Sequence, residues 1–142
     1  MSIVVDYTAP NSSSDLALVI EGKKLYVSRG SLAIRSPVFY LMFYGEFGEN
    51  NQDELTLKGP KYEEFLALLK VMYPPYDEIK DVKTLEFLLE WGDFYQLATI
   101  LLECDLRLAL LIYRKDNMIT LEKKLLLTDK YKLRASKARS VA

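Results

Sequence analysis

The chain has 142 residues, 50% of them hydrophobic, with 19 Lys and Arg against 20 Asp and Glu, which is typical of one folded domain rather than of a disordered chain or a membrane bundle. It contains no histidine, which excludes Ser-His-Asp catalysis, Cys-His catalysis and histidine-liganded zinc. The single cysteine, Cys104, excludes an intramolecular disulfide and any CxxC metal or redox motif.

The first part of the chain predicts a short β-prone start, a polar linker and a hairpin. The apolar run before Asp6 covers only residues 3–5, and residues 7–14 are mainly polar, so we expect a strand-like segment and linker over residues 1–14. The β-prone runs at residues 16–20 and 25–27 predict two strands, joined by a turn over residues 21–24.

Two helices are predicted after the hairpin. Helical spacing begins at Arg29, and Ser36-Pro37 is typical of a capping residue followed by the first residue of a new helix. One face of that second helix carries the apolar side chains Phe39, Met42 and Phe43. Gly45 can end it, and residues 45–53, which have two glycines and no helical period, predict an exposed loop.

The rest of the chain predicts one more strand and then helices. Residues 55–57 alternate as a short strand, and the next helix has an apolar face made of Phe65, Leu68, Leu69 and Met72. Pro74-Pro75 stops it, and Thr84 is expected to cap a helix whose apolar face is Leu85, Leu88, Leu89 and Gly92. A turn near Gln96 leads to a helix that carries Ile100, Leu101, Cys104 and Leu108. Few short strands followed by many helices predict an α+β fold with the sheet near the N-terminal half.

One short pattern occurs twice. Residues 93–97 (DFYQL) recur as residues 129–133 (DKYKL). We expect both copies to end one helix and turn directly into another, with the Tyr and the Leu folding back onto the preceding helix. Two copies are too few for a solenoid.

The charge is uneven along the chain. Residues 1–106 hold 9 basic and 17 acidic side chains, whereas residues 107–142 hold 10 basic and 3 acidic ones. A basic end can bind nucleic acid or another anionic surface. It lacks the Gly-rich or aromatic-interleaved pattern of single-strand binders, so a solvated helical end is favoured and nucleic acid is not an expected partner.

Many of these segments, in this order, resemble a BTB (POZ) domain. The resemblance runs through residues 15–22 (DLALVIEG), 25–29 (LYVSR), 32–39 (LAIRSPVF), 42–43, 55–57, 62–65, 72–73, 88–89, 93–97 and Cys104. It is strongest to the nematode branch, which often follows a MATH domain, although no part of this chain resembles one. The resemblance implies a BTB fold over residues 15–110, with a short β-sheet and a cluster of helices. A C-terminal helical pair of the three-box or BACK type is expected over residues 111–142, frayed at its end.

The resemblance implies a protein-interaction adaptor rather than an enzyme. Many BTB domains bind the cullin-3 N-terminal domain and so place a substrate on a ubiquitin ligase. Phe47-Gly48-Glu49 occupies the position of the family's cullin-binding motif, and an exposed Phe can act as an interface anchor. The alternative is that Phe47 folds back onto the core. Tyr95 matches a family tyrosine near the same surface, with a core role as the alternative.

The resemblance also implies that the domain pairs with itself or with a related BTB protein. Asp15 and Arg29 match an acid and a base that many members hold near the dimer interface, or they orient the first hairpin within one chain. Leu32 and Phe39 are candidates for the dimer interface and also for the core. Ser31 stands where related adaptors often carry an aliphatic dimer contact, which weakens the expectation of a tight homodimer.

The sequence allows two functions other than a cullin adaptor. A BTB scaffold could oligomerise and recruit proteins without binding cullin-3. An acid/base enzyme could use Glu63-Glu64 or Asp77-Glu78, but adjacent carboxylates point in different directions and no nucleophile or phosphate loop accompanies them. No cofactor or metal is expected. The substrate is not identifiable from the sequence.

No segment has the pattern of a signal peptide or the length of a bilayer span. We therefore expect a protein of the cytoplasm or the nucleus, without a membrane partner.

Overall fold

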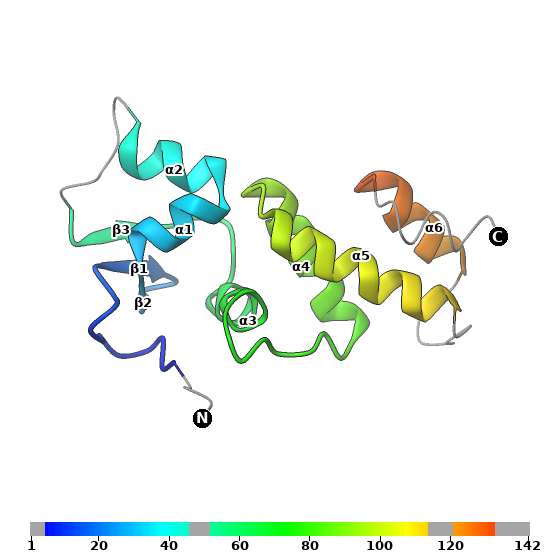
Figure 1. Cartoon of the computed structure of the whole chain (residues 1–142), viewed down its shortest axis with the longest axis horizontal. Helices are drawn as coiled ribbons and strands as arrows, with labels where there is room; N and C mark the ends of the chain where they lie inside the picture. Colours follow the sequence, from blue (N-terminus) through cyan, green and yellow to red (C-terminus); the bar gives the residue numbers. More distant parts are fainter. Residues whose placement is uncertain (1–4, 46–51, 114–120, 133–142) are drawn as a thin grey trace.

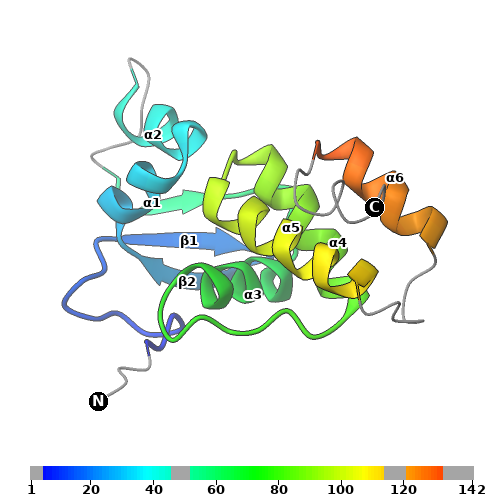
Figure 2. The ribbon, with the colours of Figure 1, turned by 45° about the vertical axis from the view of Figure 1, so that its right-hand side comes forward.

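The computed structural model describes residues 5–45, 52–113 and 121–132. In chain order the elements are β1 (Leu16–Ile20), β2 (Lys23–Val27), α1 (Arg29–Arg35), α2 (Pro37–Tyr44), β3 (Glu54–Thr56), α3 (Tyr62–Met72), α4 (Val82–Phe94), α5 (Ala98–Tyr113) and α6 (Leu121–Lys130). The sheet and the α1–α2 pair lie at one end, α6 lies at the other, and α3, α4 and α5 lie between them (Figure 1). The turned view shows the same order (Figure 2). The predicted α+β class is confirmed.

The sheet has three strands in the order β2-β1-β3, with β1 antiparallel to β2 and parallel to β3. The predicted hairpin is therefore present, but its turn is tighter than expected. Only Glu21 and Gly22 form it, with φ of 52° and 77°, because two successive positive φ angles match the twist of the flanking strands. β2 consequently starts at Lys23, two residues earlier than the predicted strand.

Part of the linker packs against the body of the domain. The backbone N–H of Tyr26 donates to the carbonyl of Tyr7 at 2.7 Å, and the Tyr7 ring lies 6.4 Å from that of Tyr73. Tyr7 is accordingly buried. Residues 1–4, which belong to the predicted strand-like start, lie outside the described residues.

Ser36 joins the start of α2 to the α4–α5 junction. Its side chain caps α2 as predicted, accepting a hydrogen bond from the Phe39 amide at 3.0 Å. The same hydroxyl donates to the carbonyl of Tyr95 at 2.5 Å, and Ser36 is fully buried. The first bond follows from local sequence, whereas the second joins residues 59 positions apart.

Replacing Ser36 by alanine is expected to lower the free energy of unfolding by about 1–3 kcal/mol, because the cap is lost and the buried Tyr95 carbonyl loses its donor. Urea unfolding followed by circular dichroism measures this change. Ser12→Ala, at an exposed position of the linker, is the control and should stay within about 0.5 kcal/mol of the parent. An equally small effect of Ser36→Ala would contradict the prediction.

The expected start of α4 is wrong by three residues. The helix begins at Val82, and its cap is Asp81, whose carboxylate accepts a hydrogen bond from the Thr84 amide at 2.7 Å. This bond lowers the pKa of Asp81. Asp and Thr both cap helices well, so the local sequence did not separate them. The preceding helix ends as predicted: α3 stops at Met72, close to Pro74 and Pro75.

The repeated pattern forms the same turn twice. Tyr95 and Tyr131 each donate their backbone N–H to the carbonyl four residues earlier, at 3.0 and 3.1 Å. The next residues, Gln96 and Lys132, both have positive φ, 52° and 54°. The helix end predicted at each copy is confirmed. Residues 133–142, where a second helix was expected after the later copy, lie outside the described residues.

One hydrophobic cluster forms the core and extends from the sheet to α6. An aromatic group lies inside it, with the Phe39 ring 4.6 Å from that of Tyr95 and 5.5 Å from that of Phe43. α6 joins the cluster through Leu127, and Lys123 of α6 pairs with Glu86 of α4 at 2.5 Å. The predicted helix start at residues 117–120 lies outside the described residues.

Candidate protein-interaction surface

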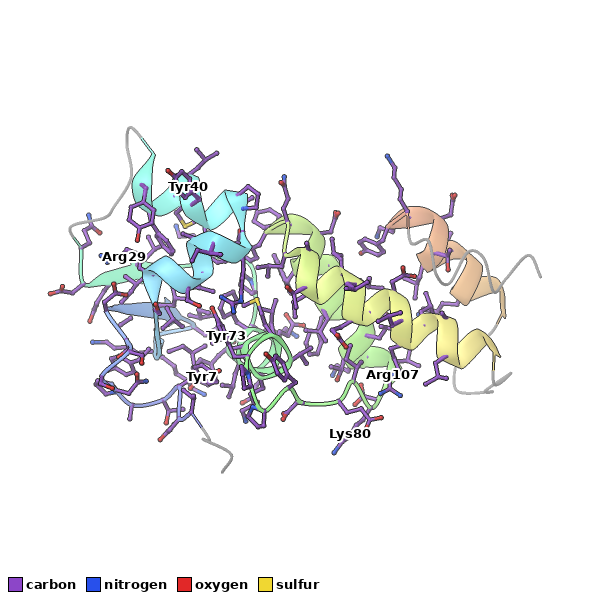
Figure 3. All side chains as sticks on the ribbon, in the orientation of Figure 1. Tyr7, Arg29, Tyr40, Tyr73, Lys80 and Arg107 are labelled. Carbon is purple, nitrogen blue, oxygen red and sulfur yellow. The ribbon has the colours of Figure 1, made fainter. Side chains whose placement is uncertain are left out.

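The outer side of α2 is an apolar surface, which we call the α2 face. Its eight residues, PVFYLMFY, include no charged side chain. Phe39 and Phe43 point into the core, whereas Tyr40, Leu41 and Tyr44 are 53%, 66% and 44% exposed. Figure 3 places Tyr40 at the outer edge of the molecule. Because a helix that is apolar on all sides is normally covered, the α2 face is a candidate for contact with another protein.

A second exposed aromatic lies at the α4–α5 junction. Phe94 is 60% exposed and packs edge-on against Tyr95, with ring centroids 4.9 Å apart. Tyr95 itself is 1% exposed, and burial raises its pKa to about 12. The stack of Tyr95 on Phe39 joins this junction to α2. The side chain that reaches solvent here is therefore Phe94, which sequence reasoning missed although it lies off the apolar face of α4.

Asp15 and Arg29 are joined within the chain through the backbone of Arg29. The carboxylate of Asp15 accepts from the backbone N–H of Arg29 at 2.7 Å, at the first residue of α1. The Arg29 guanidinium donates to the carbonyl of Gln52 and lies 6.0 Å from the Phe43 ring. Asp15 therefore holds the hairpin to the first turn of α1. Of the two roles expected for Asp15 and Arg29, this contact is the one within a single chain. A contact of these residues at a dimer interface stays a prediction.

Leu32 and Phe39 are both fully buried in the core. This is the core position that the sequence allowed for both residues, and a contact of either with a second subunit stays a prediction. The exposed apolar residue on α1 is Ile34, at 85%. Burial could not be read from the local pattern, because α1 and α2 carry apolar residues on both their inner and outer sides.

Phe47 and Glu49 lie outside the described residues. The segment that contains them follows α2 directly, and its two described flanks are tied to neighbouring structure. The Gly45 amide donates to the Leu41 carbonyl at 2.9 Å, and Gln52 accepts from Arg29.

Comparison with known families agrees with this architecture. The model of the BTB/POZ domain matches residues 6–109 of the chain. The chain belongs to the BTB/POZ family. The predicted membership of the BTB (POZ) family is therefore confirmed.

Several relatives of this BTB domain are nematode proteins. It is 41% identical over 91 residues to BTB and MATH domain-containing protein 38 of Caenorhabditis elegans, covering 64% of this chain and 23% of that protein. It is 34% identical over 88 residues to protein 36 of the same series, covering 62% and 27%. The match thus spans about a quarter of the length of these relatives.

A solved structure shows the same fold at low sequence identity. The BTB domain of human gigaxonin is 17% identical, with a TM-score of 0.55 over 65% of this chain and 75% of that one. The short sheet with its cluster of helices is therefore a BTB fold.

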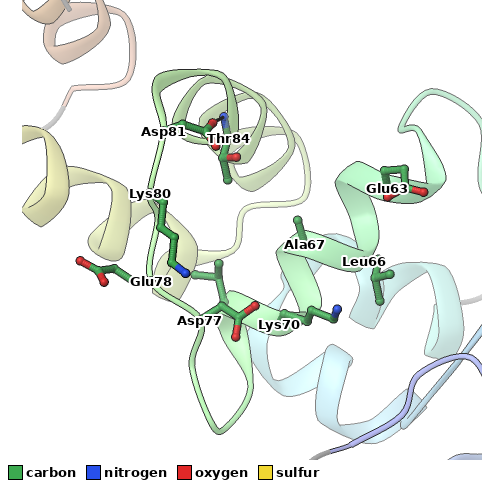
Figure 4. A pocket seen from close by; sticks show the side chains of 10 residues that line it. Glu63, Leu66, Ala67, Lys70, Asp77, Glu78, Lys80, Asp81 and Thr84 are labelled. Atoms are coloured by element: carbon green, nitrogen blue, oxygen red, sulfur yellow. Dashed lines mark hydrogen bonds between the residues drawn. The ribbon is translucent and has the colours of Figure 1, made fainter. Parts of the chain in front are cut away.

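One carboxylate of each pair in the enzyme hypothesis takes part in structural contacts. Glu64 accepts hydrogen bonds from the Trp91 indole at 3.1 Å and from the Lys61 amide at 3.2 Å. Glu78 pairs with Arg107 at 2.5 Å. Figure 4 shows Glu63, Asp77 and Glu78 pointing in different directions around a polar pocket of about 370 Å³.

Residues 5–45, 52–113 and 121–132 contain no group of three or more His, Cys, Asp or Glu side chains that could hold a metal ion. Burial raises the pKa of the Cys104 thiol to about 12, so the thiolate that a nucleophile needs is disfavoured. No described helix is long and apolar enough to cross a membrane. A BTB domain is a protein-interaction module, and the α2 face is the feature that fits this role.

Proposed function

We propose that this BTB domain is an adaptor that binds the cullin-3 N-terminal domain and so places another protein on a ubiquitin ligase. Its family and its BTB and MATH relatives support an adaptor role in protein interaction. The observation that carries the finer proposal is the α2 face, followed at once by Phe47-Gly48-Glu49.

The chemistry of the α2 face suits a protein partner. Tyr40 and Tyr44 lie one turn apart, with ring centroids 5.6 Å apart, and rigid aromatic side chains of this kind dominate binding energy at interfaces. Leu41 adds an exposed aliphatic side chain to the same helix. Phe94 is a further exposed aromatic, linked to the inner side of α2 because it packs on Tyr95 and Tyr95 stacks on Phe39.

Calorimetric titration of the chain with the cullin-3 N-terminal domain tests the proposal. We expect binding at micromolar affinity or better, weakened about 30-fold or more by Leu41→Lys, which places a charge in the apolar contact. Leu106→Lys on α5, where the leucine is 50% exposed, is the matched control and should bind as the parent does. No heat and no complex from the folded chain would exclude cullin binding.

A scaffold that only self-associates is the second candidate, and Ile34 favours it because an 85% exposed isoleucine on α1 is available to a second copy. Light scattering of the free chain, with Ile34→Lys alongside, separates the two candidates. A dimer that Ile34→Lys dissociates, together with no cullin binding, would support the scaffold.

A further inference from the structure

A groove of about 460 Å³ lies between the α3–α4 loop and α5, and we call it the α5 groove. Its rims are Tyr76 on the loop and Leu106 on α5, which are 61% and 50% exposed. Its buried apolar lining includes Val71 and Ile79, both 5% exposed. Two large apolar side chains that remain exposed beside a groove with buried apolar residues in its lining indicate a surface that a partner side chain can fill.

The loop that forms one rim is held in place. The Tyr76 amide donates to the Tyr73 carbonyl at 2.9 Å, and the Asp77 amide donates to the Lys70 carbonyl at 2.8 Å. Glu78 pairs with Arg107 at 2.5 Å and so ties the loop to α5. Because the loop is already anchored, it loses less conformational entropy when a partner binds.

Tyr76 is the unusual residue of this loop. Its φ is 59°, a left-handed conformation that is unfavourable for a bulky side chain. Its ring is mainly in solvent, so burial in the core of the free chain does not offset this cost. The conformation instead holds an aromatic ring on the rim of the groove.

The charges around the groove select the chemistry of the partner. Three carboxylates, Asp77, Glu78 and Glu103, line it together with one guanidinium, that of Arg107. Arg107 is already paired with Glu78, so the lining carries a net charge of about −2 at neutral pH, the surplus coming from Asp77 and Glu103. Charge complementarity therefore favours a partner that combines apolar side chains with Lys or Arg.

We propose that the α5 groove binds a basic amphipathic segment of a partner protein, with an aliphatic side chain between Tyr76 and Leu106 and a Lys or Arg near Glu103. Figure 3 places Arg107 and Lys80 at the lower right and Tyr40 at the upper left, so the groove is separate from the α2 face. This site goes beyond the proposed cullin contact and does not depend on it. A partner in the groove leaves the α2 face open.

The probe is an alanine-based helical peptide that carries leucines on one face and lysines elsewhere, labelled for fluorescence anisotropy. Two comparison peptides replace every lysine by glutamate or every leucine by serine. We expect the basic amphipathic peptide to bind, with amide shifts in ¹⁵N spectra centred on the groove, and the other two to bind at least tenfold more weakly. Raising the salt concentration should weaken binding further, because the attraction is partly electrostatic.

Matched variants separate the groove from the rest of the surface. Leu106→Ser and Glu103→Lys should each weaken binding of the basic peptide about tenfold or more. Leu102→Ser, one turn away on the same helix and 56% exposed, and Glu90→Lys, an exposed position on α4, should leave it unchanged. All four positions are at least half exposed or on the surface, so the variants are expected to fold.

Three results would overturn this proposal. One is equal binding of the glutamate peptide, and another is a set of spectral shifts centred away from the groove. The third is a dimer of the free chain that Leu106→Ser dissociates, because a second copy would then be the occupant. The two proposals can fail independently. Leu41→Lys should weaken binding of the cullin-3 domain and leave binding of the basic peptide unchanged, and Leu106→Ser should have the opposite effect.

Discussion

Replacing Phe47 and Glu49 together by alanine is expected to abolish binding to the cullin-3 N-terminal domain. We propose that Phe47 is the apolar anchor and that Glu49 accepts hydrogen bonds that fix it, and losing both should cost about 3 kcal/mol or more, at least 100-fold in affinity. Calorimetry with the parent and the double variant measures the effect.

The control for this prediction lies in the same segment. Asn50→Ala together with Asn51→Ala changes two polar neighbours and should leave the affinity within a factor of about three. Both double variants should have the thermal midpoint of the parent, which shows that the fold is intact. If the Phe47 and Glu49 double variant bound the cullin-3 domain with the affinity of the parent, these two residues would not belong to the interface. The α2 face would then be the remaining candidate for the contact.

Replacing Phe39 by alanine is expected to lower the free energy of unfolding by about 3–5 kcal/mol. The ring is fully buried, stacked on Tyr95 at 4.6 Å and edge-on to Phe65 at 6.2 Å. Removing it leaves a cavity where α2, α3 and the α4–α5 junction meet. Since domains are stable by only about 5–15 kcal/mol, this is a large share of the total. Urea unfolding at constant protein concentration gives the value.

Tyr40, the next residue on α2, provides the matched comparison. It is 53% exposed, so Tyr40→Ala should cost less than about 1 kcal/mol, and Phe39→Leu should cost less than Phe39→Ala because most of the volume is kept. Equal costs at positions 39 and 40 would contradict the burial that separates them. If Phe39 acted mainly at a dimer interface, Phe39→Ala would instead lower the molecular mass in light scattering and leave the monomer stable.

Local signals in the sequence predicted most of the elements. The Ser36-Pro37 pair marks the start of α2, and the two prolines after α3 mark its end. The spacing of Phe65, Leu68, Leu69 and Met72 places them on one face, and all four are buried. These signals are local because capping, proline geometry and helical periodicity depend on residues a few positions apart.

The candidate site was harder to predict. α2 is apolar on every side, so its periodicity does not distinguish Phe39, in the core, from Tyr40 and Leu41, in solvent. Tyr95 and Phe94 are likewise adjacent aromatics, yet one is buried and the other exposed. Which of two neighbours is covered depends on elements far away in sequence, as the bond between Ser36 and the Tyr95 carbonyl shows.

Composition excluded histidine chemistry, and short-range spacing predicted the α+β class and most helix ends, whereas the family was predicted from the resemblance of many short segments to a BTB (POZ) domain. The burial of Leu32, Phe39 and Tyr95 and the exposure of the α2 face became known from the packing of the elements in three dimensions. This packing also brought the loop at Tyr76 against α5 to form a groove with acidic side chains. Burial and the meeting of distant charges depend on how elements pack, and no local pattern of residues encodes that packing.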